Sequence, residues 1–270
     1  AKTDIGLTGQ IAEKWNVELT YFKSKSKDLI LDSAQSYSTG IPDASITTNI
    51  GKAQNTGVEF SFGGIVLQRG DFTWNTNLNV TYVKNKVTEL ESDIVESGTG
   101  AANITVEGKS MAQLYLYPTA GIDKETGRRV VLLDDANGNP TREALLVYTR
   151  GAGASVYDRT TGEKLDINDW KAHIWGNTKP TYYGGWTNNF TWRNWDATVF
   201  FQFSGGNKIY NGTKATTSDM RFWNNTSDVY KHGWRNPGDV ATYAKPEQND
   251  NYSNGSANPI SDWAENGDYL

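Results

Sequence analysis

The chain of 270 residues contains no cysteine, 2 histidines, 2 methionines and no long apolar run. Without cysteine it can form neither a disulfide framework nor a thiolate metal site. Its longest apolar runs, such as Val130 to Leu133 and Val199 to Phe201, fall far short of the roughly 18 residues of a membrane-spanning helix. A net charge of -5 and a pI near 5.2 lack the basic character of a nucleic-acid-binding protein.

Catalytic motifs are scarce as well. The two histidines, His173 and His232, are about sixty residues apart, and neither belongs to a metal-binding spacing. The sequence has neither the glycine-flanked serine of a hydrolase elbow nor a phosphate-binding loop. No enzyme class is indicated.

One segment resembles a calcium loop in part. Asp135, Asn137 and Asn139 occupy positions one, three and five of an EF-hand-like loop. Pro140 replaces the turn glycine and Leu146 replaces the bidentate glutamate, so two required features are missing. We therefore expect a turn without metal, and the sequence indicates no cofactor.

What the sequence does contain is aromatic side chains in alternating patterns. It has 10 Trp, 14 Tyr and 9 Phe at a mean hydropathy of only -0.63. Between Phe72 and Tyr82, large apolar residues alternate with asparagine and threonine, which is the period of a β-strand. Small polar groups opposite aromatics suit a wall between lipid and a water-filled lumen. Phe200 interrupts the pattern of its strand.

The alternation predicts six strands and a lipid-facing side. The strands are expected near residues 4–11, 15–31, 47–62, 72–87, 181–192 and 195–204. The side chains predicted to face lipid are Trp15, Val17, Leu19, Tyr21, Phe72, Trp74, Leu78, Val80, Tyr82, Trp192, Trp195, Val199, Phe201 and Phe203.

The connections between these strands alternate in length. The short links are residues 12–14, 63–71 and 193–194, and the long ones are residues 33–46, 88–179 and 205–266. Outer-membrane barrels have tight periplasmic turns and long outer loops, whereas a soluble sandwich does not sort its loops in this way. The long outer loops 88–179 and 205–266 are expected to carry hairpins, one of them with Asn137-Gly138 in a type I′ turn.

Six strands do not close a barrel, even if a seventh begins at Tyr269-Leu270. An open edge is not tolerated in lipid, and single-chain bacterial barrels have about 8 strands or more. The predicted fold is therefore all-β: an antiparallel transmembrane β-barrel segment of six to seven strands with long extracellular loops, being an internal piece of a larger barrel.

Aromatic residues in the long loops are candidates for contact with a ligand or a partner, because flat rings stack on sugars and pack against peptides. Packing of the loops against one another is the favoured interpretation. The candidates are Trp170, Trp175, Trp223, Tyr230, Trp234 and Tyr243.

Several motifs, in order along nearly the whole chain, resemble the SusC/RagA-like TonB-dependent transporters of Bacteroidetes. The motif around Trp234 departs slightly from the family's pattern at the tryptophan. The segments that carry the resemblance are 49–59, 72–90, 121–127, 177–190, 234–239 and 265–270.

The resemblance implies a much longer outer-membrane protein of a Gram-negative bacterium, with a plug domain inside a 22-strand barrel. It also implies partners: a SusD-like surface lipoprotein over the outer loops, and the TonB complex, contacted through parts absent from this chain. The implied function is nutrient uptake, the import of an oligosaccharide or oligopeptide without catalysis.

Two other functions compete with import. The rival is a soluble all-β carbohydrate-binding or adhesin module, in which Trp74, Leu78 and Val80 would interdigitate with a second sheet instead of facing lipid. A passive porin is a further alternative, which only the resemblance ranks lower.

Overall fold

The computed structural model describes residues 1–34, 38, 40, 45–49, 51–90, 94–98, 101–222 and 225–268. Trp223 and the expected seventh strand at Tyr269-Leu270 lie outside these residues. No helix in the described part is both long and apolar enough to cross a membrane.

Six long strands form one antiparallel sheet, which we call the wall. In spatial order they are β1 (Lys2–Ile11), β2 (Trp15–Ser26), β5 (Lys52–Arg69), β6 (Phe72–Glu89), β16 (Tyr182–Trp192) and β17 (Trp195–Gly205). Within the described residues β1 and β17 are the edges, so the sheet does not close. The predicted all-β class and partial antiparallel barrel are confirmed.

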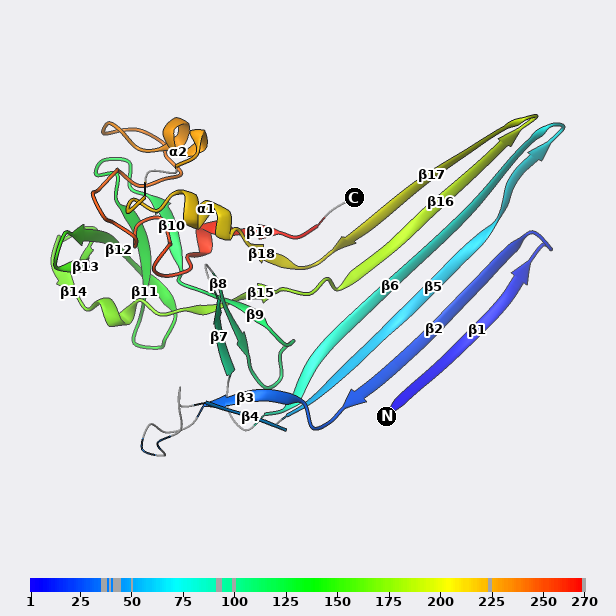
Figure 1. Cartoon of the computed structure of the whole chain (residues 1–270), viewed down its shortest axis with the longest axis horizontal. Helices are drawn as coiled ribbons and strands as arrows, with labels where there is room; N and C mark the ends of the chain where they lie inside the picture. The colour runs from blue at the N-terminus through cyan, green and yellow to red at the C-terminus, as the bar shows by residue number, and fades with distance from the viewer. Residues whose placement is uncertain are drawn as a thin grey trace.

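The tight turns all lie at one end of the wall, and every other element lies at the opposite end (Figure 1). The turns are residues 12–14, 70–71 and 193–194. The turn at residues 70–71 is shorter than the predicted link 63–71, because β5 continues to Arg69 through a bulge between Ile65 and Leu67. A bulge shifts the alternation of side chains by one residue. The period-two pattern of this strand therefore stops before the strand itself ends.

The expected strand 15–31 is also divided. β2 ends at Ser26, and a separate hairpin follows, made of β3 (Ile30–Ala34) and β4 (Ser45–Asn49). Asp28, between β2 and β3, has a left-handed φ of 55°. The chain changes direction there, which a period-two pattern does not reveal.

The long connections fold together into what we call the loop domain, the described residues of 101–177 and 207–266 (Figure 1). Its larger sheet is β10 (Thr119–Ile122), β11 (Arg129–Asp134), β12 (Pro140–Thr149), β13 (Gly153–Asp158) and β14 (Lys164–Leu165). A second sheet, which also includes β7 (Ile94–Gly98), is β15 (His173–Asn177), β9 (Gln113–Leu116) and β8 (Ala101–Thr105). The remaining elements are β18 (Lys208–Tyr210), β19 (Ala264–Asn266), α1 (Gly212–Thr217), α2 (Ser227–His232) and the short 3-10 helices η3 (Ile167–Asp169) and η4 (Ser261–Trp263).

The expected hairpin at Asn137-Gly138 is present between β11 and β12, but the type I′ turn is wrong. Only Gly138 of the two has a positive φ, 76°, whereas a type I′ turn needs positive φ at both residues. Asp135 Oδ1 instead accepts hydrogen bonds from the backbone N–H groups of Asn137 (2.8 Å) and Asn139 (3.0 Å). That aspartate therefore organises the turn, and its expected lack of metal stays a prediction.

Candidate functional site

The two faces of the wall differ in chemistry, one being mainly apolar and the other mainly polar. Directly paired residues of antiparallel strands point to the same face, so the register assigns each side chain to a face. Trp74 pairs with Phe190, and Phe62 pairs with both Val17 and Leu78. All fourteen residues predicted to face lipid fall on this one face, which we call the outward face. That it meets lipid remains a prediction.

Aromatic side chains border the outward face at both ends. We call the end of the wall next to the loop domain its upper end and the end with the tight turns its lower end. Near the tight turns they are Trp15, Phe72, Trp192 and Trp195, and near the loop domain they are Tyr21, Tyr82 and Tyr182. Ten residue steps from Phe72 to Tyr82 cover about 34 Å at about 3.4 Å per residue. With the strand tilt of about 40° that is usual in barrels, the band is about 26 Å high, close to the apolar band of outer-membrane barrels.

Many of these apolar side chains are strongly exposed, among them Leu7 (74%) and Trp195 (75%). The six strands pair only with one another among the described residues, and no second sheet stacks on them (Figure 1). Exposed apolar surface of this extent marks an interface with something other than water.

Two polar residues sit in the middle of the outward face, and both are buried. Thr76 Oγ1 donates a hydrogen bond to Asn188 Oδ1 at 3.0 Å. Two tryptophans complete the network, since Trp74 Nε1 donates to Asn188 Oδ1 (3.1 Å) and Trp186 Nε1 donates to Thr76 Oγ1 (2.8 Å). Indole N–H groups and small polar groups thus satisfy each other within a buried patch of the outward face.

The opposite face of the wall, which we call the inner face, is lined by amides and hydroxyls. Asn189 Oδ1 accepts a hydrogen bond from Thr198 Oγ1 (2.9 Å), and Asn79 Oδ1 accepts one from the Gly185 N–H (3.1 Å). Phe200, which interrupts the alternation, lies on this face next to Gly185, where an added Cβ would be only 3.0 Å from its ring. The ring occupies the space that the glycine leaves.

A cavity of about 710 Å³ lies where the upper inner face meets the loop domain. Asn85 is one of its lining residues: its Oδ1 accepts hydrogen bonds from Ser110 Oγ (3.2 Å) and the Met111 N–H (2.9 Å), and its Nδ2 donates to Asn55 Oδ1 (2.7 Å). Gln113 Nε2 donates to Asn177 Oδ1 at 2.6 Å. Lys84, Lys109 and Lys179 also line it. The cavity therefore offers amide, hydroxyl and ammonium groups to a polar molecule.

The loop aromatics divide into packed and exposed residues. Trp170, Trp234 and Tyr243 are buried, as expected if the loops pack against one another, and their contact with a ligand or partner stays a prediction. They pack within the loop domain and use their polar atoms there: Trp170 Nε1 donates to Pro118 O (2.9 Å) and Trp234 Nε1 donates to Lys124 O (2.7 Å). Trp175 and Tyr230 are exposed, and Tyr230 stacks beneath the Arg235 guanidinium at 4.3 Å.

A fully buried arginine lies in the loop domain, and no sequence pattern indicated it. Arg129 of β11 has no exposed side-chain surface and forms an ion pair with Asp262. Its Nε donates to Ser253 O (2.7 Å), and its guanidinium carbon lies 5.4 Å from the Trp263 ring centroid. Burial lowers the pKa of Arg129, while Asp262 raises it in part. No periodicity identifies such a residue, since its partners lie more than a hundred residues away.

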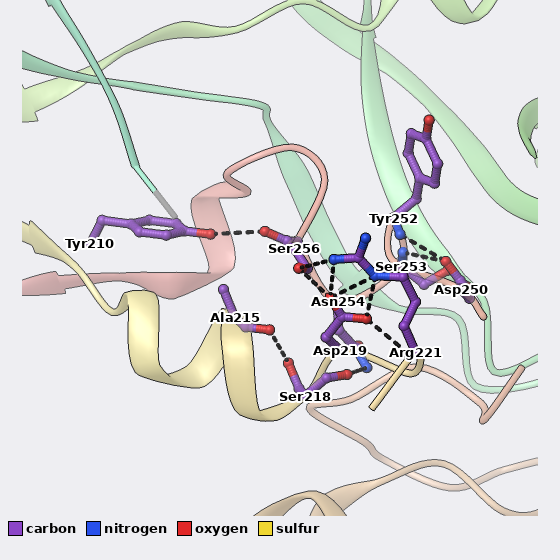
Figure 2. Close-up of polar contacts among 11 residues, drawn as sticks. Tyr210, Ala215, Ser218, Asp219, Arg221, Asp250, Tyr252, Ser253, Asn254 and Ser256 are labelled. Atoms are coloured by element: carbon purple, nitrogen blue, oxygen red, sulfur yellow. Dashed lines mark hydrogen bonds and ion pairs between the residues drawn. The ribbon is translucent and has the colours of Figure 1, made fainter. Parts of the chain in front are cut away.

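A second polar cluster lies beside it. Asp219 accepts hydrogen bonds from Arg221 and Ser256, close to Asn254 (Figure 2). Burial alone would raise the pKa of Asp219, but these hydrogen bonds outweigh it and the pKa lies below its ordinary value. Asn254 connects this region to Arg129, because its Oδ1 accepts from Arg129 Nη2 (3.3 Å) and its Nδ2 donates to Ser218 O (3.1 Å). These contacts fix the fold of the loop domain.

Comparison with known proteins agrees with this architecture. Residues 2–114 match the family model described as TonB dependent receptor-like, beta-barrel, which is a receptor family and not an enzyme family. TonB-dependent receptor P39 of Formosa agariphila is 26% identical over 90% of the chain, and receptor P3 of the same bacterium is 26% identical over 80%. TonB-dependent receptor SusC of Bacteroides thetaiotaomicron is 31% identical over 41% of the chain.

The solved structure titled RagAB peptide transporter superposes with a TM-score of 0.72 at 19% identity and covers 99% of this chain. The chain spans only part of each relative: 26% of receptor P39, 22% of receptor P3, 12% of SusC and 27% of the RagAB chain.

Proposed function

We propose that this chain, which is similar to TonB-dependent receptors in sequence and in fold, forms part of the wall and the outer loops of a nutrient importer in a bacterial outer membrane. The observation that carries the proposal is the two-faced wall. An apolar face about 26 Å high, bordered by aromatic rings, suits the hydrocarbon core of a bilayer, and an amide-lined face suits an aqueous lumen.

In this proposal the tight turns face the periplasm and the loop domain lies outside the cell. The substrate is an oligosaccharide or an oligopeptide, which the amides of the inner face and of the cavity lined by Asn85 would bind by hydrogen bonds. A SusD-like lipoprotein would contact the loop domain, and Trp175 and Tyr230 are the exposed aromatics available to it. Contact with TonB would come from other parts of the protein.

The soluble carbohydrate-binding module fits less well. It requires a second sheet against Trp74, Leu78 and Val80, and no such sheet covers them in the described part of the chain. A passive porin has the same two-faced wall, so energy dependence separates the two: uptake should stop when TonB is uncoupled.

Insertion is tested by placing one charge on either face of the same strand. Leu78→Arg puts a charge at mid-height of the outward face, and Asn77→Arg puts the same charge on the inner face one residue away. An arginine at the bilayer midplane of a barrel costs about 2–4 kcal/mol on the lipid side. We expect Leu78→Arg to reduce heat-resistant barrel recovered from outer membranes, with Asn77→Arg close to wild type.

Equal recovery of the two arginine variants would contradict the proposed wall. The substrate class is tested separately, by uptake of labelled oligosaccharides and labelled oligopeptides into cells with functional or uncoupled TonB. Uptake of neither class above the uncoupled background would contradict nutrient import.

A further inference from the structure

Four lysines lie on the outward face just beyond its upper aromatic border. They are arranged in two rows across β2, β5 and β6. In the first row Lys23 pairs with Thr56, which pairs with Lys84. In the second row Lys25 pairs with Gln54, which pairs with Lys86.

The four positions form a compact group. Neighbouring strands are about 4.8 Å apart, so the lysines of β2 and β6 are separated by about 10 Å, and successive rows by about 7 Å. Between them, Gln54 Nε2 donates a hydrogen bond to Thr56 Oγ1 at 3.0 Å. The surface thus combines four ammonium groups with a hydroxyl and an amide.

No carboxylate neutralises this group within the described residues. None of the four lysines takes part in an ion pair of that part of the chain, and Lys25, Lys84 and Lys86 are exposed. Glu89, near the end of β6, is already paired with Lys52 at 2.5 Å. A positive surface therefore persists on a chain whose net charge is -5.

Charge is sorted between the two faces of these strands. Glu18 pairs with Thr8 and Ser61, and Glu59 pairs with Thr20, all on the inner face. Below the lysines, the outward face of these strands carries only uncharged side chains down to the level of Phe72. At that level Arg69 pairs with Phe72. The positive charge is thus confined to the two ends of the apolar band, and four lysines gather at the upper end.

We propose that this lysine surface binds the phosphate-bearing headgroup of an outer-leaflet lipid. The inference rests on the proposed function, because it takes the outward face to be in a bilayer. Lys23 and Lys84 lie one row above Tyr21 and Tyr82, where the apolar band ends and headgroups begin. At that depth lysine stems lie along apolar surface with their charges at the interface, and basic clusters attract anionic headgroups.

A lipid is the occupant that the position favours. The surface is continuous with the apolar face, so a molecule with acyl chains would contact both at once. A free phosphate ion would use only the lysines, and a protein partner would have to displace lipid from the wall below.

The experiment uses the complete membrane-inserted protein that contains this chain. The variant Lys23→Gln/Lys25→Gln/Lys84→Gln/Lys86→Gln is compared with a control that loses the same charge from exposed, unpaired lysines of the loop domain: Lys124→Gln/Lys164→Gln/Lys231→Gln/Lys245→Gln. Each protein, in neutral detergent, is titrated with diphosphoryl lipid A, phosphatidylcholine or inorganic phosphate, and bound lipid is counted by native mass spectrometry. We expect the lysine-surface variant to bind lipid A about tenfold or more weakly, and the control to match wild type.

Equal binding of lipid A by both variants would overturn the inference, and so would inorganic phosphate that displaces lipid A at equal concentration. Loss of binding in the control alone would overturn it too. The proposed function fails separately: if Leu78→Arg and Asn77→Arg insert equally well, the outward face is not in a bilayer. If those two differ and the lysine variants do not, only the lipid inference is wrong.

Discussion

The wall and the loop domain solve the burial of apolar side chains in opposite ways. In the loop domain Trp263, Tyr243, Leu133 and Ile260 are at most 1% exposed and pack into one core. In the wall the large apolar side chains stand on one face with nothing from the described chain upon them. The loop domain is built as water-soluble proteins are, around a core of its own side chains. The wall depends on its surroundings to cover its apolar face, and backbone hydrogen bonds between strands hold it together.

The largest expected effect that separates the two parts comes from Arg129→Ala. Removing one partner of a buried ion pair leaves Asp262 uncompensated and costs about 3–5 kcal/mol. We expect the loop domain to lose amide protection in hydrogen exchange while the strands of the wall keep theirs. Arg150→Ala, which removes an exposed guanidinium, is the control. Loss of protection in both parts at once would mean that they unfold as one unit.

A smaller effect is expected from the polar network of the wall. Asn188→Leu removes the acceptor of Trp74 Nε1 and Thr76 Oγ1, and an unsatisfied buried polar group costs about 1–3 kcal/mol. The matched control is Asn189→Leu, one residue along on the inner face, where water can replace the lost hydrogen bond. The measurement is the urea midpoint of the barrel refolded into lipid vesicles. A lower midpoint only for Asn189→Leu would contradict the assigned faces.

The smallest effect is expected from acid. Hydrogen bonds from Tyr243 and His232 lower the pKa of Asp228, and those from Lys214 and Asn211 lower the pKa of Glu265. A carboxylate with a lowered folded-state pKa stabilises the fold above its unfolded pKa, about 4, and that stability is lost as pH falls through the folded value. Near-ultraviolet circular dichroism of the buried tryptophans should therefore weaken below about pH 4.

Carboxamide substitution provides the check on this acid effect. The double variant Asp228→Asn/Glu265→Gln should have a circular dichroism signal that changes less between pH 5 and pH 3 than the wild-type signal does. Backbone hydrogen bonds of the wall do not titrate, so its far-ultraviolet signal should stay constant. An acid transition of the same size in the double variant would show that other groups cause it.

The sequence predicted the wall better than the loop domain, for a physical reason. A strand with one face in each of two media must alternate, so parity alone placed Trp74, Leu78 and Val80 on the same face as Trp192. Parity failed where the register shifts, at the bulge between Ile65 and Leu67.

In the loop domain, by contrast, contacts join residues far apart in the sequence. Arg129 meets Asp262, and the Tyr117 N–H donates to Pro259 O. Neither pair leaves a local pattern. The same lack of pattern made Trp170 and Trp234 look equivalent to Trp175, although the first two are buried and Trp175 is exposed.

The loop domain draws its core from two segments, and the β16–β17 hairpin lies between them in the sequence. This arrangement has a consequence for the order of folding. The first segment, which contains β11, cannot bury Arg129 until the second segment brings Asp262 back across 133 residues. Contacts of such long separation form slowly because loop closure comes first. The hairpin itself reaches back to β6 across a similar separation, since Tyr182 pairs with Tyr82 and Trp192 with Phe72. We therefore expect the joining of the wall and the closing of the loop domain to be late steps that both depend on the second half of the chain.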